Sequence, residues 1–255
     1  MDISLQLYSI KEEAAENFAG ALELVQKAGY QGVEFAGYFG NGPAQMKALL
    51  DRYKLRAVST HLGLARLTEA LDEEIAFAKA LGYRLLVCPG VSADSAEGYA
   101  RQARALEECA QRAAKEGFRV GYHNHTHEFT RYGGSYALDI ILENAPTLQF
   151  QPDLFWIARG GVDPLSYVEP LAKAGRICAI HAKELAKTGD ANVYVGEGRI
   201  DFKAIAKLCP PDRYPWIIEQ EEYRGNHAGG DHAEGSHADG IATSYQGLRR
   251  IFDSL

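Results

Sequence analysis

Short apolar runs alternate with amphipathic stretches along the whole chain. Between the apolar runs, hydrophobic residues recur with helical spacing, and several of these stretches end on a glycine, as helices often do. Eight runs have the length and composition of buried strands: residues 3–8, 32–36, 55–61, 84–89, 118–125, 147–153, 176–183 and 215–221. A doubly wound sheet would alternate too, but eight even units of about 30 residues favour closure. We therefore predict an α/β fold, a single-domain (β/α)8 TIM barrel over residues 1–255.

Polar residues share one parity within most of the predicted strands. In the fifth strand His123 and His125 alternate with Val120 and Tyr122, so the histidines face the barrel axis and the other two pack under the helices. The same pattern assigns to the lumen Ser4, Gln6 and Tyr8; Ala57, Ser59 and His61; Gln149, Gln151 and Asp153; Ala179, His181 and Lys183; and Ile217, Glu219 and Glu221. The acids and histidines come at the C-terminal strand ends, where barrel enzymes build their active sites, and this predicts a polar pocket.

Four residues on successive strands suggest a metal site. Glu128 follows the fifth strand, and Asp153, His181 and Glu219 stand at the ends of the next three. Three carboxylates in one lumen would repel each other, whereas a divalent cation would leave about one negative charge, which Lys183 can balance. Oxygen ligands with one nitrogen suit Mn²⁺ best, with Mg²⁺, Co²⁺ or Zn²⁺ as alternatives. We expect one divalent metal ion as cofactor.

Several motifs, in this order and spacing, resemble the xylose-isomerase-like TIM-barrel superfamily, in particular its sugar phosphate isomerase/epimerase and inosose-dehydratase-like branch. They are "GYHNHTHEF", "FQPDLFWIARGGVDP", "IHAKE", "VGEGRIDF" and "WIIEQEE". The resemblance implies a divalent metal held by Glu128, Asp153, His181 and Glu219. Many relatives place the first ligand on the strand itself, where His123 stands here. His123 or His125 is therefore an alternative ligand, and Glu128 would then contact the substrate.

The same pocket supplies candidate catalytic groups. A carboxylate such as Glu219 or Glu128 would remove a proton next to a carbonyl that the metal polarises. His123, His125 and Lys183 are candidates for the second acid or base. The alternative roles are structural: the histidines would orient the metal ligands, and Lys183 would pair with a neighbouring glutamate.

Four side chains are expected to bind the substrate. Glu34 and His61 end the second and third strands, His123 faces the lumen, and Trp156 follows Asp153 by three residues. Glu34 and His61 could instead form satisfied hydrogen bonds at the rim, and Trp156 could simply cover a loop.

These residues predict a metal-dependent sugar isomerase or epimerase that acts on a ketose or keto-sugar through an enediolate. A dehydratase or lyase of the inosose or 3-keto-glycoside type would use the same site. A more distant alternative is an endonuclease IV-like DNA repair enzyme. Such enzymes resemble this barrel, but they have an extra histidine at the position that Trp156 occupies in this chain. A non-catalytic sugar-binding protein would not need buried carboxylates.

Composition and charge limit the partners. The chain has 27 Lys and Arg against 34 Asp and Glu, a net charge of −7 and no basic run, so we expect no nucleic acid as partner. Its apolar runs are too short to cross a membrane, and its start does not read as a signal peptide, so a cytoplasmic location is expected. The basic residues form no compact phosphate motif, which favours a non-phosphorylated small-molecule sugar or keto-sugar. Relatives often assemble, so a homo-oligomer remains open.

Two further features of the sequence favour structural roles. The four cysteines have no C-x-x-C spacing and are expected to be buried free thiols. A Gly- and His-rich segment at about 225–240 contains His227, His232 and His237. So many glycines favour a lid-like loop or a connector over a second metal site.

Overall fold

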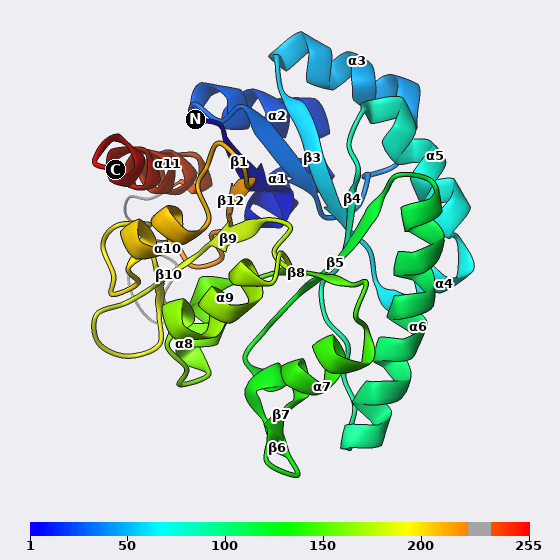
Figure 1. Ribbon diagram of the computed structural model, residues 1–255. Coiled ribbons are helices and arrows are strands. Elements are labelled where there is room, and N and C mark those ends of the chain that lie inside the picture. The colour runs from blue at the N-terminus through cyan, green and yellow to red at the C-terminus, as the bar shows by residue number, and fades with distance from the viewer. Residues whose placement is uncertain (224–235) are drawn as a thin grey trace.

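All eight predicted strands form. The computed structural model describes residues 1–223 and 236–255, and within them eight parallel strands pair in the order β8-β5-β4-β3-β2-β1-β12-β9 (Figure 1). The strands are β1 (Ile3–Gln6), β2 (Gly32–Phe35), β3 (Arg56–His61), β4 (Leu85–Cys88), β5 (Arg119–His123), β8 (Gln149–Gln151), β9 (Ile180–Ala182) and β12 (Trp216–Ile218). This confirms the predicted barrel.

The barrel closes between β8 and β9 by two isolated bridges instead of a full ladder. Phe150 pairs with Ile177, and Asp153 pairs with His181. The amide of Cys178 donates to the carbonyl of Phe150 at 2.9 Å across this seam. The result is a nearly closed barrel whose seam includes two of the candidate site residues.

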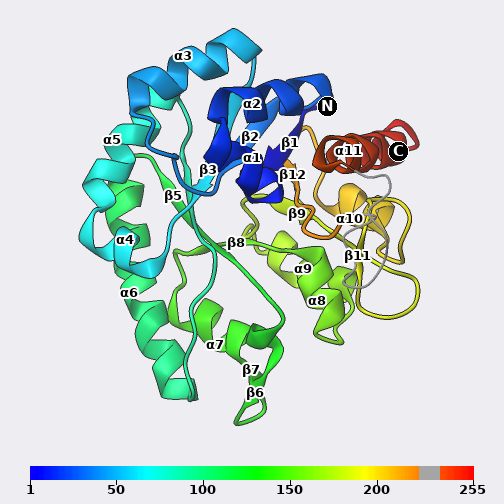
Figure 2. The ribbon, with the colours of Figure 1, turned by 180° about the vertical axis from the view of Figure 1, so that it is seen from behind.

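Helices surround the strands on the outside (Figures 1 and 2). They are α1 (Lys11–Glu16), α2 (Phe18–Lys27), α3 (Pro43–Tyr53), α4 (Leu64–Glu69), α5 (Leu71–Leu81), α6 (Ala96–Lys115), α7 (Ala137–Asn144), α8 (Leu154–Arg159), α9 (Pro164–Lys173), α10 (Phe202–Leu208) and α11 (His237–Asp253). At the end of α5, Gly82 has φ of 84°, the left-handed conformation expected of a glycine there.

The apolar core has two parts. The larger lies between strands and helices, and a smaller cluster fills the lumen with Leu85, Val87, Cys178, Ala179 and Ile217. Ala179 and Ile217 were predicted to face the lumen and do so, whereas Cys178 joins the same cluster against the predicted alternation.

Strand β3 departs from the predicted parity. Its register with β2 shifts between Val33 and Glu34, so Val58 joins the lumen cluster and Ala57 packs against the outer core. The prediction that Ala57 faces the lumen was wrong, because a β-bulge changes the alternation locally.

Short elements complete the chain. Two 3₁₀ turns, η1 (Leu7–Ile10) and η2 (His127–Phe129), follow β1 and β5. Two small hairpins, β6 (Arg131–Tyr132) with β7 (Ser135–Tyr136) and β10 (Glu184–Leu185) with β11 (Asn192–Val193), extend from the loops.

Several expectations concern segments outside the barrel strands. Most of the proposed lid-like loop, with His227 and His232, lies outside the described residues, whereas His237 begins α11. All four cysteines are buried and free, as expected. Among the helices that the structure describes, none is both long enough and apolar enough to cross a bilayer.

Candidate functional site

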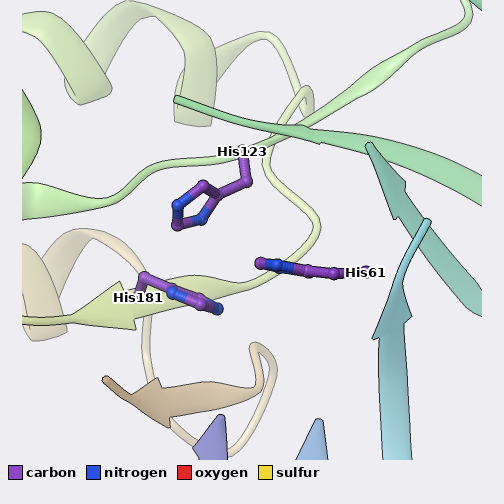
Figure 3. A group of neighbouring side chains, drawn as sticks. All are labelled: His61, His123 and His181. Carbon is purple, nitrogen blue, oxygen red and sulfur yellow. The ribbon is translucent and has the colours of Figure 1, made fainter. Parts of the chain in front are cut away.

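Four buried side chains converge at the C-terminal ends of the strands. His123 ends β5, Asp153 follows β8, His181 lies in β9 and Glu219 follows β12. Their potential ligand atoms all lie within 4.8 Å of one another. His61, at the end of β3, points toward the same place, and Figure 3 shows its ring with those of His123 and His181 around one small space.

Two potential ligand atoms of this four-residue cluster have no hydrogen-bond partner among the described residues. They are Asp153 Oδ2 and His123 Nδ1, and both are inaccessible to solvent. The other oxygen of Asp153 accepts a hydrogen bond from the amide of Trp156 at 2.9 Å and so caps α8. Because buried polar atoms are normally satisfied, two such atoms without a hydrogen bond in one cluster of ligand residues fit a site for a divalent cation.

Hydrogen bonds fix the two remaining members of the cluster. His181 Nδ1 lies 2.9 Å from Glu219 Oε2 and 3.9 Å from Asp153 Oδ2. Its other nitrogen, Nε2, lies 2.6 Å from Glu34 Oε1 below the cluster. His181 is therefore held between carboxylates on both sides.

The charges of the cluster depend on burial and on these contacts. Burial raises the pKa of Asp153 to about 7. Burial lowers the pKa of His181, but the carboxylates of Glu34 and Glu219 outweigh it and raise that pKa to about 10. For Glu219, burial opposes ionisation, yet Lys183 and His181 hold its pKa well below the ordinary value. Burial also lowers the pKa of His125 to about 4, so this imidazole is neutral at pH 7.

Glu128 lies outside the four-residue cluster. Its Oε1 accepts from the Tyr122 hydroxyl at 2.7 Å and its Oε2 from the amide of His125 at 2.8 Å. It belongs to η2, beyond the end of β5. The strand position that faces the other ligands is occupied by His123, the alternative that the sequence left open.

Glu34 is also placed differently from the expected rim position. It is completely buried beneath the cluster and does not line the pocket described below. In this geometry Glu34 is therefore not placed to contact a substrate directly.

A pocket of about 420 Å³ opens above the cluster. Of the residues expected to meet the substrate or to act in catalysis, it brings together His61, His123, His125, Trp156 and Glu219. Its other lining residues are Tyr8, Ala36, Pro89 and Glu221. Tyr8 was missed as a site residue, although it shares the lumen parity of the first strand.

Lys183 lies under one wall of the pocket. Its ammonium pairs with Glu221, lies 3.8 Å from Glu219 Oε1 and is 4.4 Å from the centre of the Trp156 ring. The side chain is only 1% exposed. Two carboxylates and an aromatic face thus compensate this buried charge.

The sequence profile of the xylose isomerase-like TIM barrel family matches residues 22–251, nearly the whole chain. The chain belongs to this family. No curated protein sequence gives a significant match.

Solved structures share the fold of this family member at low identity. A sugar phosphate isomerase/epimerase from Parabacteroides distasonis is 21% identical with a TM-score of 0.80, over 97% of this chain and 93% of the other. An L-ribulose 3-epimerase is 17% identical with a TM-score of 0.72, over 100% and 95% of the two chains. A probable 3-DHS dehydratase involved in petrobactin synthesis, from Bacillus anthracis, is 15% identical with a TM-score of 0.69, over 98% and 99%. Family and neighbours consist mostly of enzymes.

Proposed function

We propose that this protein is a divalent-metal-dependent sugar isomerase or epimerase that removes a proton next to the carbonyl of a non-phosphorylated keto-sugar. The observation that carries the proposal is the buried four-residue cluster, in which two potential ligand atoms have no hydrogen-bond partner within the described chain. A cluster of this kind at the C-terminal mouth of a barrel is where such chemistry is found.

His123, Asp153, His181 and Glu219 would hold the metal. When bound, the ion would act as a Lewis acid that stabilises negative charge on a substrate oxygen. Two carboxylates and two imidazoles suit Mn²⁺, with Co²⁺, Zn²⁺ and Mg²⁺ as the other ions to test. Glu128, the ligand first expected, would instead fix the backbone of His125 through its hydrogen bond.

The chain's own groups supply the proton transfers. Glu219 lines the pocket and is held ionised, so it can accept the proton from carbon. His125 lines the same pocket as a neutral imidazole, a form that can accept a proton, and would act as a second base. Lys183 lies beneath the pocket wall next to Glu219 and would act on the reaction by keeping that carboxylate ionised.

The charge of the pocket favours an uncharged sugar. Its charged lining residues in the described chain are Glu219 and Glu221, and the nearby ammonium of Lys183 already pairs with both. Among the described lining residues a phosphate would meet two carboxylates and no unpaired cation, and a DNA phosphodiester would meet the same repulsion. Tyr8 and Trp156 offer aromatic faces to the C–H groups of a sugar.

Hydrogen exchange with solvent tests the proposal. The protein loaded with Mn²⁺ is incubated in D₂O with ketoses, inososes and 3-keto-glycosides, and deuterium at the carbon next to the carbonyl is followed by NMR. Exchange with one of these substrates is expected. Loss of a β-hydroxyl in place of exchange would assign the dehydratase reaction. Neither reaction with any substrate, together with no bound metal by elemental analysis, would overturn the proposal.

A pair of aspartates provides a matched control. Asp153 and Asp163 each cap a helix, by accepting from Trp156 and from Ser166, but only Asp153 belongs to the four-residue cluster. Asp153→Ala should lower metal affinity at least about 100-fold and abolish exchange, because it removes a ligand and its charge. Asp163→Ala loses a cap alone and should keep both.

A further inference from the structure

The carboxylate of Glu34 collects hydrogen bonds from four other strands or strand ends. Glu34 lies in β2, is fully buried and is enclosed by five donors. Its partners are Gln6 Nε2 at 2.7 Å, Gln151 Nε2 at 2.7 Å, His181 Nε2 at 2.6 Å, His61 Nε2 at 3.0 Å and the hydroxyl of Ser59. No lone pair is left for a substrate, so the role of this carboxylate must lie with its partners.

Two of the partners are histidines that meet the same oxygen. The Nε2 atoms of His61 and His181 both approach Glu34 Oε1, and the two rings are stacked 5.4 Å apart at 14° (Figure 3). A carboxylate among so many donors is ionised and only accepts hydrogen bonds. Each histidine must therefore carry a hydrogen on Nε2, so the nitrogen of His181 that can give up its hydrogen to a metal is Nδ1.

Gln151 supports the same assignment for His61. Its amide nitrogen donates to Glu34 Oε2, which turns its oxygen toward His61 Nε2 at 2.9 Å. The reversed amide would place an oxygen against the carboxylate. His61 Nε2 thus faces two acceptors and must donate.

We propose that Glu34 is a positioning residue that fixes His61 and His181 with the hydrogen on Nε2, so that His181 binds the metal through Nδ1. This inference rests on the proposed metal site. His181 Nδ1 is the nitrogen that faces Asp153 and Glu219, so the assignment agrees with the geometry above it. A carboxylate that orients a metal-binding imidazole in this way typically changes metal affinity 10- to 100-fold when it is removed.

NMR of the unmodified protein tests the tautomer directly. Protein with ¹⁵N-labelled histidine is titrated with Zn²⁺, a diamagnetic probe, and the ring nitrogens of His181 are assigned. We expect Zn²⁺ to shift the Nδ1 resonance while Nε2 keeps its directly bonded hydrogen. Coordination through Nε2 would overturn the inference, and this result does not depend on whether any variant folds.

A substitution tests whether Glu34 is the residue that makes His181 bind the metal through Nδ1. Glu34→Gln should weaken Zn²⁺ binding 10- to 100-fold in calorimetry, because an amide cannot accept hydrogen bonds from both histidines on one ionised group. Glu107→Gln is the matched control: Glu107 is a buried carboxylate that accepts from Thr147, away from the pocket. Its Zn²⁺ affinity should stay within about twofold.

The outcomes separate this inference from the proposed function. If the unmodified protein binds neither Zn²⁺ nor Mn²⁺, the metal-dependent function fails. If it binds Zn²⁺ and Glu34→Gln, folded by circular dichroism, binds it equally well, only the role of Glu34 fails.

Discussion

Single residues in this barrel owe their chemistry mainly to burial. The thiols of Cys88 and Cys178 are fully buried, and burial raises the pKa of each to about 12. Cys178 fills the lumen beneath the four-residue cluster, and Cys88 ends β4. Both should stay protonated, and therefore unreactive, at any ordinary pH as long as the protein is folded.

These thiols make stability depend on pH in a defined direction. In the unfolded chain they ionise near the ordinary pKa of about 8.5, whereas in the folded chain they keep their protons up to about pH 12. Between these values the unfolded state binds fewer protons, so the free energy of unfolding falls as pH rises. Urea unfolding at pH 7.5 and 9.5 should show this decrease, and Cys88→Ala with Cys178→Ala should reduce it. Rapid reaction of either thiol with a thiol reagent in the folded protein would contradict the prediction.

At the scale of elements, α11 packs very closely on the loop after β11. A Cβ added at Gly247 would lie 1.7 Å from the carbonyl oxygen of Val195 and 2.8 Å from its carbon. The hydroxyl of Ser244, one turn earlier in α11, accepts from the amide of Val195 at 3.3 Å. A glycine is needed at position 247 because the helix backbone itself contacts the loop.

Gly247→Ala should therefore destabilise the protein by about 3 kcal/mol, since neither backbone can move far. The measurement is urea unfolding monitored by circular dichroism. Gly63→Ala is the control, because a Cβ there meets nothing within 4 Å and φ is −60°. Gly63 is the N-cap of α4, where Ala is less favourable than Gly, but Ala also restricts the unfolded chain, so stability should change by less than about 1 kcal/mol. Equal effects of the two substitutions would contradict close packing of α11.

Element patterns also explain how much the sequence could predict. Apolar runs located the eight barrel strands, and period-two alternation predicted that Asp153, His181 and Glu219 lie together at the C-terminal end of the barrel, where the structure has them. It could not place Glu128, because this residue lies in the 3₁₀ turn η2, where alternation no longer applies. Nor could it reveal the bulge in β3, which moves Val58 into the lumen.

Contacts between strands that lie far apart in the sequence set the remaining limit on what the sequence could predict. Glu34 meets His181, a residue 147 positions away, only because β2 and β9 face each other through the barrel. Position along the strand predicted a polar contact for Glu34 correctly. Whether its partner is a sugar or a set of buried side chains depends on the depth of the pocket floor, which no local pattern encodes.

At the scale of the whole molecule, metal binding should be visible as thermal stability. A ligand that binds only the folded state stabilises it by about 2.7 kcal/mol at 100 times its Kd. For a chain of this size, that corresponds to a rise in Tm of about 5–10 °C. Differential scanning calorimetry with Mn²⁺, and again after chelation, should show this rise and its reversal. Asp153→Ala should show no rise, and a rise equal to that of the unmodified protein would place the ion elsewhere.

The seam between β8 and β9 gives the proposed metal site a second, structural role. His123 and Asp153 come from β5 and the end of β8 on one side of the seam, and His181 and Glu219 from β9 and the end of β12 on the other. One ion bound to all four would connect the two edges much as a disulfide connects two distant parts of a chain. A cross-link of this kind opposes opening most strongly where few backbone hydrogen bonds do so. The bound ion would then both take part in the reaction and hold the barrel closed. Activity and an intact barrel would therefore depend on the same ion.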